Sequence, residues 1–291
     1  MGSKATTIDQ QISQLQQRGM NLDIGIDKTK EVLLDIGYYR LGFYWNPFEK
    51  DKHHNFHTDT KMSDVLDLYY LDVDLRNVLS RYLKRIEINF RTKVIYFCSN
   101  EYSHNPQWFI DSSIMNEDFV ESFPKKIYNW KFKEYNEVIK KHHKKYGNKG
   151  YAPAWKTLEF LSFGTILKMF RAIKEESLQK MIAMQYDIRK EYIFINHLTV
   201  FTLVRNICAH GGTLFDFRAP KGISFVPALL LDKKDRHSLN AIITLVSYYL
   251  GKVSTNRKSD FDNEIETVMI SNRFSPIIKS IIETKINYKS V

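Results

Sequence analysis

Cysteine is nearly absent from this sequence, and proline and glycine are scarce. The 291 residues include two cysteines, and both Cys98 and Cys208 lie within apolar, helix-like patterns. Two such residues exclude a disulfide framework and a cysteine-based zinc site, so we expect both to be core residues. Seven prolines and twelve glycines leave room for long, uninterrupted helices.

The sequence also lacks a long hydrophobic run. Its longest apolar stretches, around residues 192–204 and 241–250, are interrupted or too short for the roughly 20 residues that span a bilayer. The N-terminus is polar and glutamine-rich and has no apolar core of a secretory signal. We therefore expect a cytoplasmic protein with no membrane association.

The charge that the sequence has in excess is positive. Lysine and arginine number 43 against 33 acidic residues, a net charge of +10, which favours a nucleic acid or another anionic partner. Nine lysines and two glutamates fall within residues 124–149, interleaved with aromatic residues. Phosphate neutralisation and base stacking can act side by side there. We expect RNA contacts from Lys140, Lys141, Lys144 and Lys145, although such a run is more often a solvated helix face.

The apolar spacing predicts an all-α protein, a helical bundle. Its clearest pattern runs from Leu75 to Cys98 in steps of three or four residues and indicates an amphipathic helix of about seven turns. We expect most charges on this helix to be solvated. Further helices are predicted at residues 8–17, 29–36, 188–209, 236–250, 262–272 and 276–287, with a helix start at Pro153. Residues 223–227 resemble a short strand.

The chain shows no internal repeat and no clear linker. Residues 37–48 combine six aromatic side chains with three chain breakers, which predicts a packed turn or a short helix. We expect residues 1–58 to form an N-terminal helical extension. Residues 59–291 then form the main helical domain, packed with the extension as one unit.

Reactive side chains gather at the end of the helix predicted at 188–209. Arg205 and Asn206 lie near that end and His210 at its terminus, where Gly211 can supply a left-handed cap. Histidine moves protons near neutral pH, and arginine can fork onto phosphate oxygens. The pair suits RNA cleavage, in which the 2′-hydroxyl of the RNA is the nucleophile. Purely structural roles explain the three residues equally well, with Arg205 in a salt bridge, Asn206 as the cap of a turn and His210 filling the helix end.

Arg205-Asn206-x-x-Ala209-His210 resembles the Arg-x4-6-His motif of the HEPN ribonuclease superfamily, whose members are helical bundles. The resemblance extends to the aromatic block at residues 37–48, to the helix residues 71–91 and to Trp155 with Ser162-Phe163-Gly164. With these marks the chain is similar to the Abi-like abortive-infection family of bacterial phage-defence proteins.

The resemblance implies a HEPN-like fold and metal-independent RNA cleavage without a cofactor. Two motifs face each other in such a site, so a chain with one motif is expected to form a homodimer. By the same resemblance, Arg205 would hold the scissile phosphate, His210 would act as general base or acid, and Asn206 would orient one of them. Glu87 and Arg91 are weaker candidates for a supporting role, since a plain ion pair is the commoner explanation. Arg40 is a further candidate RNA contact.

Two other interpretations stay open. The chain is alternatively a non-catalytic RNA-binding or interaction module of a defence system, and a small regulatory RNA acting as antitoxin fits either interpretation. The histidines at 53, 54, 57, 142 and 143 suggest a metal, but they lack carboxylates or cysteines at ligand spacing. We therefore expect no metal site.

Overall fold

The computed structural model describes residues 4–147 and 150–288, and within them all regular secondary structure is helical. The prediction of an all-α protein is confirmed. The first half holds α1 (Ile8–Gln17), α2 (Ile26–Asp35), α3 (Tyr38–Trp45), α4 (Met62–Glu101), α5 (Glu117–Lys126), α6 (Trp130–Tyr135) and α7 (Glu137–Tyr146). The second half holds α8 (Ala154–Thr157), α9 (Phe163–Ala172), α10 (Glu176–Met184), α11 (Glu191–Ala209), α12 (Leu239–Val253), α13 (Thr255–Met269) and α14 (Pro276–Ile281).

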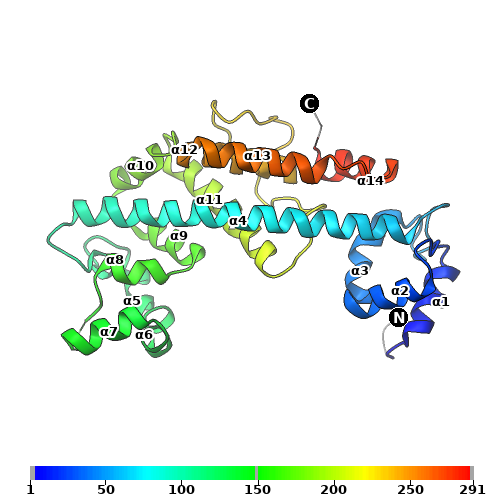
Figure 1. Ribbon diagram of the computed structural model, residues 1–291. Coiled ribbons are helices and arrows are strands. Elements are labelled where there is room, and N and C mark those ends of the chain that lie inside the picture. Colours follow the sequence, from blue (N-terminus) through cyan, green and yellow to red (C-terminus); the bar gives the residue numbers. More distant parts are fainter. Residues whose placement is uncertain (1–3, 148–149, 289–291) are drawn as a thin grey trace.

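Helix α4 is the axis of the molecule. Its 40 residues contain neither proline nor glycine, so the helix runs unbroken for about 60 Å. Figure 1 shows α12, α13 and α14 along one side of α4, with α1 to α3 near one of its ends and α5 to α8 near the other. Helices α3, α9, α10 and α11 also pack directly against α4. Each of these helices buries its apolar face against the same central rod.

A cluster of aromatic rings forms the core where α4, α9 and α11 meet. Phe90 of α4 packs edge-to-face against Phe170 of α9 and Phe194 of α11, with ring centroids 5.5 and 5.7 Å apart. Tyr186 and Tyr249 stack onto the same cluster at 5.2 and 6.2 Å from Phe194. Edge-to-face and offset geometries are those that aromatic quadrupoles favour. This cluster fixes the base of α11, whose other end carries the candidate reactive residues.

The predicted helices agree with the structure in place, and some differ in length. The helix at residues 8–17 is confirmed to the residue, and the predicted turn or short helix at 37–48 is α3 with a single 3-10 turn after it. Helix α4 begins 13 residues before Leu75, because apolar residues such as Val65 and Leu68 continue the buried stripe. Pro153 is the N-cap residue of α8, which is only four residues long.

The expectation that most charges on α4 are solvated holds for Arg81, Lys84 and Arg85, which are exposed. Arg76 and Arg91 are buried instead, at 7% and 4% exposure, because each has a carboxylate on its own helix.

The expected short strand was wrong. Residues 223–227 form no strand. Instead, the amide of Ile223 donates to Arg236 O and that of Ser224 donates to Asn196 Oδ1, so local partners replace a neighbouring strand.

Helix α11 is, by length and composition alone, the one helix in the described residues that is long and apolar enough to cross a membrane. A core helix meets the same criterion, and α11 packs against α4, α9 and α10.

A buried histidine on α11 makes the stability of the fold depend on pH. His197 is fully buried, with Nε2 2.7 Å from Ser224 O and Nδ1 3.1 Å from the Tyr249 hydroxyl. Because a carbonyl oxygen only accepts, Nε2 carries the proton and donates it, and Nδ1 accepts from Tyr249. Burial lowers the pKa of His197 to about 4, so the neutral ring is the folded form.

We therefore predict that the free energy of unfolding falls as the pH drops. The unfolded histidine takes up a proton below about pH 6.5, whereas the folded one stays neutral until about pH 4. The loss between pH 7 and pH 5 should be about 2 kcal/mol, measured by urea unfolding. His197→Gln, which keeps an amide donor for Ser224 O, should lack this part of the dependence. Equal pH dependence in both proteins would contradict the assignment.

Candidate active site

The end of α11 is closed by a Schellman turn. His210 is the C-cap residue, and Gly211 follows with φ +67° in the left-handed region. The amide of Gly212 donates to Ile207 O at 2.9 Å, and that of Gly211 to Cys208 O at 3.4 Å. This is the paired pattern of the Schellman motif, and it confirms the predicted left-handed cap. The turn leaves His210 exposed at the helix end.

A buried carboxylate holds the segment that follows this turn. Asp72 of α4 accepts the backbone amides of Leu214 and Phe215 on Oδ1, at 2.8 and 2.7 Å. Its Oδ2 accepts the Tyr44 hydroxyl at 2.9 Å and pairs with Arg76. We call Asp72, Arg76 and Tyr44 the loop clamp, because together they fix residues 211–215 against α3 and α4.

Two arginines complete the attachment by binding the carbonyl groups of the turn itself. Arg76 Nη1 donates to Gly212 O at 3.0 Å, and Arg40 Nη2 donates to Gly211 O. A Cβ atom at position 211 would lie 2.9 Å from Arg40 Nη2 and would displace this guanidinium, while the positive φ itself favours glycine. The residues on both sides of His210 are therefore rigidly placed.

The clamp is a buried ion pair, and its charges depend on each other. Asp72 is fully buried and Arg76 nearly so. Burial raises the pKa of the Asp72 carboxyl, while Arg76 and the two amides act in the opposite direction. Because Arg76 keeps its charge at all relevant pH values, removal of the Asp72 charge leaves a buried cation without a partner. Removal of one charge from a buried ion pair typically lowers the free energy of unfolding by about 3–5 kcal/mol.

The three motif residues lie together at the end of α11. Asn206 and His210 are exposed and Arg205 is half-buried. Arg205 Nη1 donates to Asn206 Oδ1 at 3.3 Å, and the amide of His210 donates to Asn206 O at 3.0 Å. A cation, an amide and an imidazole therefore share one solvent-facing helix end, as the spacing predicts.

Glu87 links this helix end to α4. Its Oε1 accepts from Arg91 Nη2 at 2.7 Å, and its Oε2 lies 3.7 Å from Arg205 Nε. That Oε2 atom is buried and has no hydrogen-bond partner in the structure. Arg91 also donates to Leu161 O at 2.8 Å. Glu87 thus lies next to the motif, whereas Arg91 lies behind it and braces the segment before α9.

Two other chemistries fit this region poorly. Cys208 lies two residues before His210, but burial raises the pKa of its thiol to about 12, so it is not a ready nucleophile. In residues 4–147 and 150–288, no group of three or more His, Cys, Asp or Glu side chains is placed to hold a metal ion.

The four candidate lysines lie on α7, away from the motif. Figure 1 shows α5, α6 and α7 at one end of the molecule, separated from the end of α11. Helix α7 is anchored through His143, whose Nε2 is 2.9 Å from the buried Tyr128 hydroxyl. Lys140 pairs with Glu134 at 2.5 Å, and the others of the set, Lys141, Lys144 and Lys145, have no carboxylate within 4 Å among the described residues. Exposed Trp130, Tyr135 and Tyr146 accompany them.

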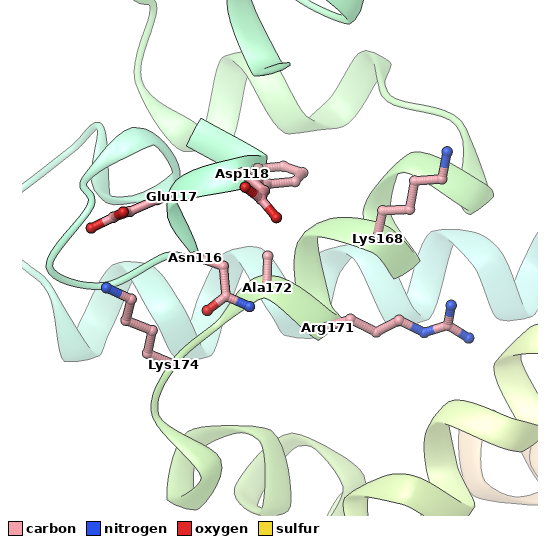
Figure 2. A pocket seen from close by; sticks show the side chains of 8 residues that line it. Asn116, Glu117, Asp118, Lys168, Arg171, Ala172 and Lys174 are labelled. Carbon is pink, nitrogen blue, oxygen red and sulfur yellow. The ribbon is translucent and has the colours of Figure 1, made fainter. Parts of the chain in front are cut away.

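An open pocket of about 500 Å³ lies between the start of α5 and the end of α9. Figure 2 shows Lys168 and Arg171 on one side and Glu117 and Lys174 on the other, with Asp118 between them. Cations and carboxylates offset each other there, and none of the candidate site residues lines the pocket. It is therefore separate from the Arg205–His210 site.

Comparison with known proteins identifies a family. A family model described as Abi-like protein matches residues 31–216, more than half of the chain, and so includes the loop clamp and the Arg205–His210 motif. No curated protein and no solved structure matches the chain.

If the α7 lysines contact RNA phosphates, they should contribute to the salt dependence of the RNA-binding constant. Replacement of Lys140, Lys141, Lys144 and Lys145 by Ala should flatten the plot of log K against log salt concentration, because each phosphate contact releases counterions. The slope for single-stranded RNA should change by about 2 to 3, since Lys140 is already paired with Glu134.

The matched control removes the same charge from acid-paired lysines elsewhere: Lys28, Lys30, Lys180 and Lys285. This variant should keep the wild-type slope. Equal flattening in both variants would mean that net charge alone, and not the α7 surface, attracts the RNA.

Proposed function

Because the chain belongs to the Abi-like protein family of abortive infection, which implies a part in phage defence, we propose that it is a cytoplasmic endoribonuclease. It cleaves RNA without a metal or a cofactor. The observation that carries the proposal is the placement of Arg205, Asn206 and His210 at one exposed helix end, fixed on both sides by hydrogen bonds. Their match to the Arg-x4-6-His spacing of HEPN ribonucleases supports the same reading.

The proposed reaction is an attack by the RNA on itself. His210 takes the proton of the 2′-hydroxyl, and the 2′-oxygen then attacks the adjacent phosphorus. The bond to the 5′-oxygen breaks, and this oxygen leaves with a proton from a general acid. The products are a 2′,3′-cyclic phosphate and a 5′-hydroxyl. Arg205 binds the phosphate oxygens as negative charge builds up on them.

This reaction needs a base and an acid, and one copy of the motif offers one imidazole. A homodimer with two motifs face to face supplies the second histidine. The exposure of Asn206, Ala209 and His210 in the single chain leaves room for that approach. We propose that the α7 lysines hold the RNA at a distance from the cut, where a small regulatory RNA would also compete.

The test is incubation of the purified protein with mixed RNA in EDTA, followed by end-group analysis. Cleavage should persist in the chelator and leave cyclic phosphate ends. His210→Ala should lower the rate by at least about 100-fold, the usual contribution of a general acid–base group, and Arg205→Ala by a similar factor, because it removes the cation that stabilises the transition-state charge. The thermal midpoint of His210→Ala should stay within about 2 °C of the wild type, because this side chain is exposed. Arg205→Ala removes the cation beside the buried Glu87 carboxylate, so its cleavage rate is compared at a temperature at which the variant is folded.

His53→Ala and Arg189→Ala serve as matched controls, since both side chains are exposed and lie outside the motif. They should cleave at the wild-type rate. A strict need for a divalent ion, a 5′-phosphate product or full activity in His210→Ala would contradict the mechanism. RNA that is bound but left intact by the dimer would favour a non-catalytic RNA-binding module.

A further inference from the structure

Two aromatic side chains stand exposed on α3. Tyr39 is 83% and Phe43 45% exposed, and their ring centroids are 5.3 Å apart at an interplanar angle of 79°. The opposite face of α3 buries Leu41, Tyr44 and Trp45. The Tyr39–Phe43 pair is therefore not part of the core, and its two rings hold each other in an edge-to-face arrangement at the surface.

Arg40 lies between the pair and the segment that follows His210. Successive residues of a helix are 100° apart, so Tyr44, Arg40, Phe43 and Tyr39 follow one another around α3. Tyr44 packs against Phe215, with ring centroids 5.8 Å apart, and Arg40 donates to Gly211 O. The next positions around the helix are those of Phe43 and Tyr39. The pair thus lies beyond Arg40 on the surface of α3, on the side away from Tyr44 and Phe215.

The charge beside the pair suits an anionic ligand. Arg40 stands between the pair and the turn and donates to a neutral carbonyl. Among the described residues it has no carboxylate within 4 Å. Arg205 supplies a second cation at the end of α11. An apolar platform with a neighbouring guanidinium is the combination that binds a nucleobase and its phosphate.

The size of the pair argues against a second protein copy as its main occupant. Because Tyr39 is 83% and Phe43 only 45% exposed, full coverage of the pair removes about 200–300 Å² of surface. A stable protein interface buries about 800 Å² on each partner. One nucleobase, in contrast, needs no more than the face of one ring.

We propose that Tyr39 and Phe43 form a stacking subsite for an unpaired nucleobase of the RNA that reaches the Arg205–His210 site. This inference rests on the proposed function in taking RNA as the ligand. The exposed ring of Tyr39 stacks on the base, Phe43 supports that ring from the side, and Arg40 contacts the adjoining phosphate. A paired base cannot enter the subsite, because its faces are covered within the duplex. The subsite therefore selects single-stranded RNA.

The experiment measures RNA binding in full-length protein that carries His210→Ala, so that the RNA stays intact. Dissociation constants for a fluorescein-labelled single strand and for the matching duplex are determined by fluorescence anisotropy. Tyr39→Leu should weaken binding of the single strand about tenfold, the lower range for loss of one stacked base. Tyr39→Phe keeps the ring and should bind within about twofold of the parent. Duplex binding should not change.

A second measurement detects the stacked base itself. A single strand that contains 2-aminopurine should lose fluorescence on binding, and Tyr39→Leu should restore it. An unchanged dissociation constant in Tyr39→Leu, or equal weakening for single strand and duplex, would overturn the subsite. A shift of Tyr39→Leu from dimer to monomer in sedimentation would overturn it as well, since the pair would then be a contact between copies.

These results are separable from a failure of the proposed cleavage. If the parent without His210→Ala leaves RNA intact but binding still requires the Tyr39 ring, the subsite stands and the ribonuclease proposal fails. If RNA is cleaved as proposed but Tyr39→Leu changes neither the dissociation constant nor the cleavage rate, the subsite fails and the ribonuclease proposal stands.

Discussion

The candidate site depends on one buried carboxylate. Asp72 binds the amides of Leu214 and Phe215, the Tyr44 hydroxyl and Arg76, and so joins α3, α4 and the segment after α11. Burial of a charge is favourable only when all of its hydrogen-bonding capacity is used, and this requirement fixes the path of the chain. Without the carboxylate, two amides would be buried without partners and the Arg76 guanidinium would lose its counter-ion.

Several features of the site gain their meaning from this attachment. Arg40 donates to Gly211 O in the turn that the loop clamp holds against α3, and the Tyr39–Phe43 pair lies beyond Arg40 on the same helix. Glu87 makes a second link between α4 and α11, through its contact with Arg205. The motif is thus held at two points along α4, while His210 and Asn206 are exposed. Rigid attachment with exposed reactive groups is the arrangement that catalysis by positioning requires.

Local patterns predicted the helices and the end of α11, because helix periodicity and a left-handed glycine are encoded by neighbouring residues. The loop clamp was not predicted. Asp72 is 28 positions from Tyr44 and 142 positions from the Leu214 amide that it binds, and no single-sequence pattern reports such distant contacts. One signal was present, since Asp72 and Arg76 are four residues apart on the apolar stripe of α4, where a charged pair must be buried together. The sequence likewise did not predict that the α7 lysines lie far from the motif, because their separation depends on how the helices pack along the 40 residues of α4.

The most direct test of the account is the behaviour of Asp72→Asn, which keeps the shape of the side chain and removes its charge. The account predicts faster amide hydrogen exchange at Leu214 and Phe215 and a cleavage rate that falls further than the unfolded fraction explains. Met269→Ala removes a buried side chain of α13 and should lower the free energy of unfolding by about 2–5 kcal/mol. Its folded fraction should still cleave RNA at the wild-type rate. Wild-type cleavage in folded Asp72→Asn with a freely exchanging loop would contradict the claim that the clamp positions His210.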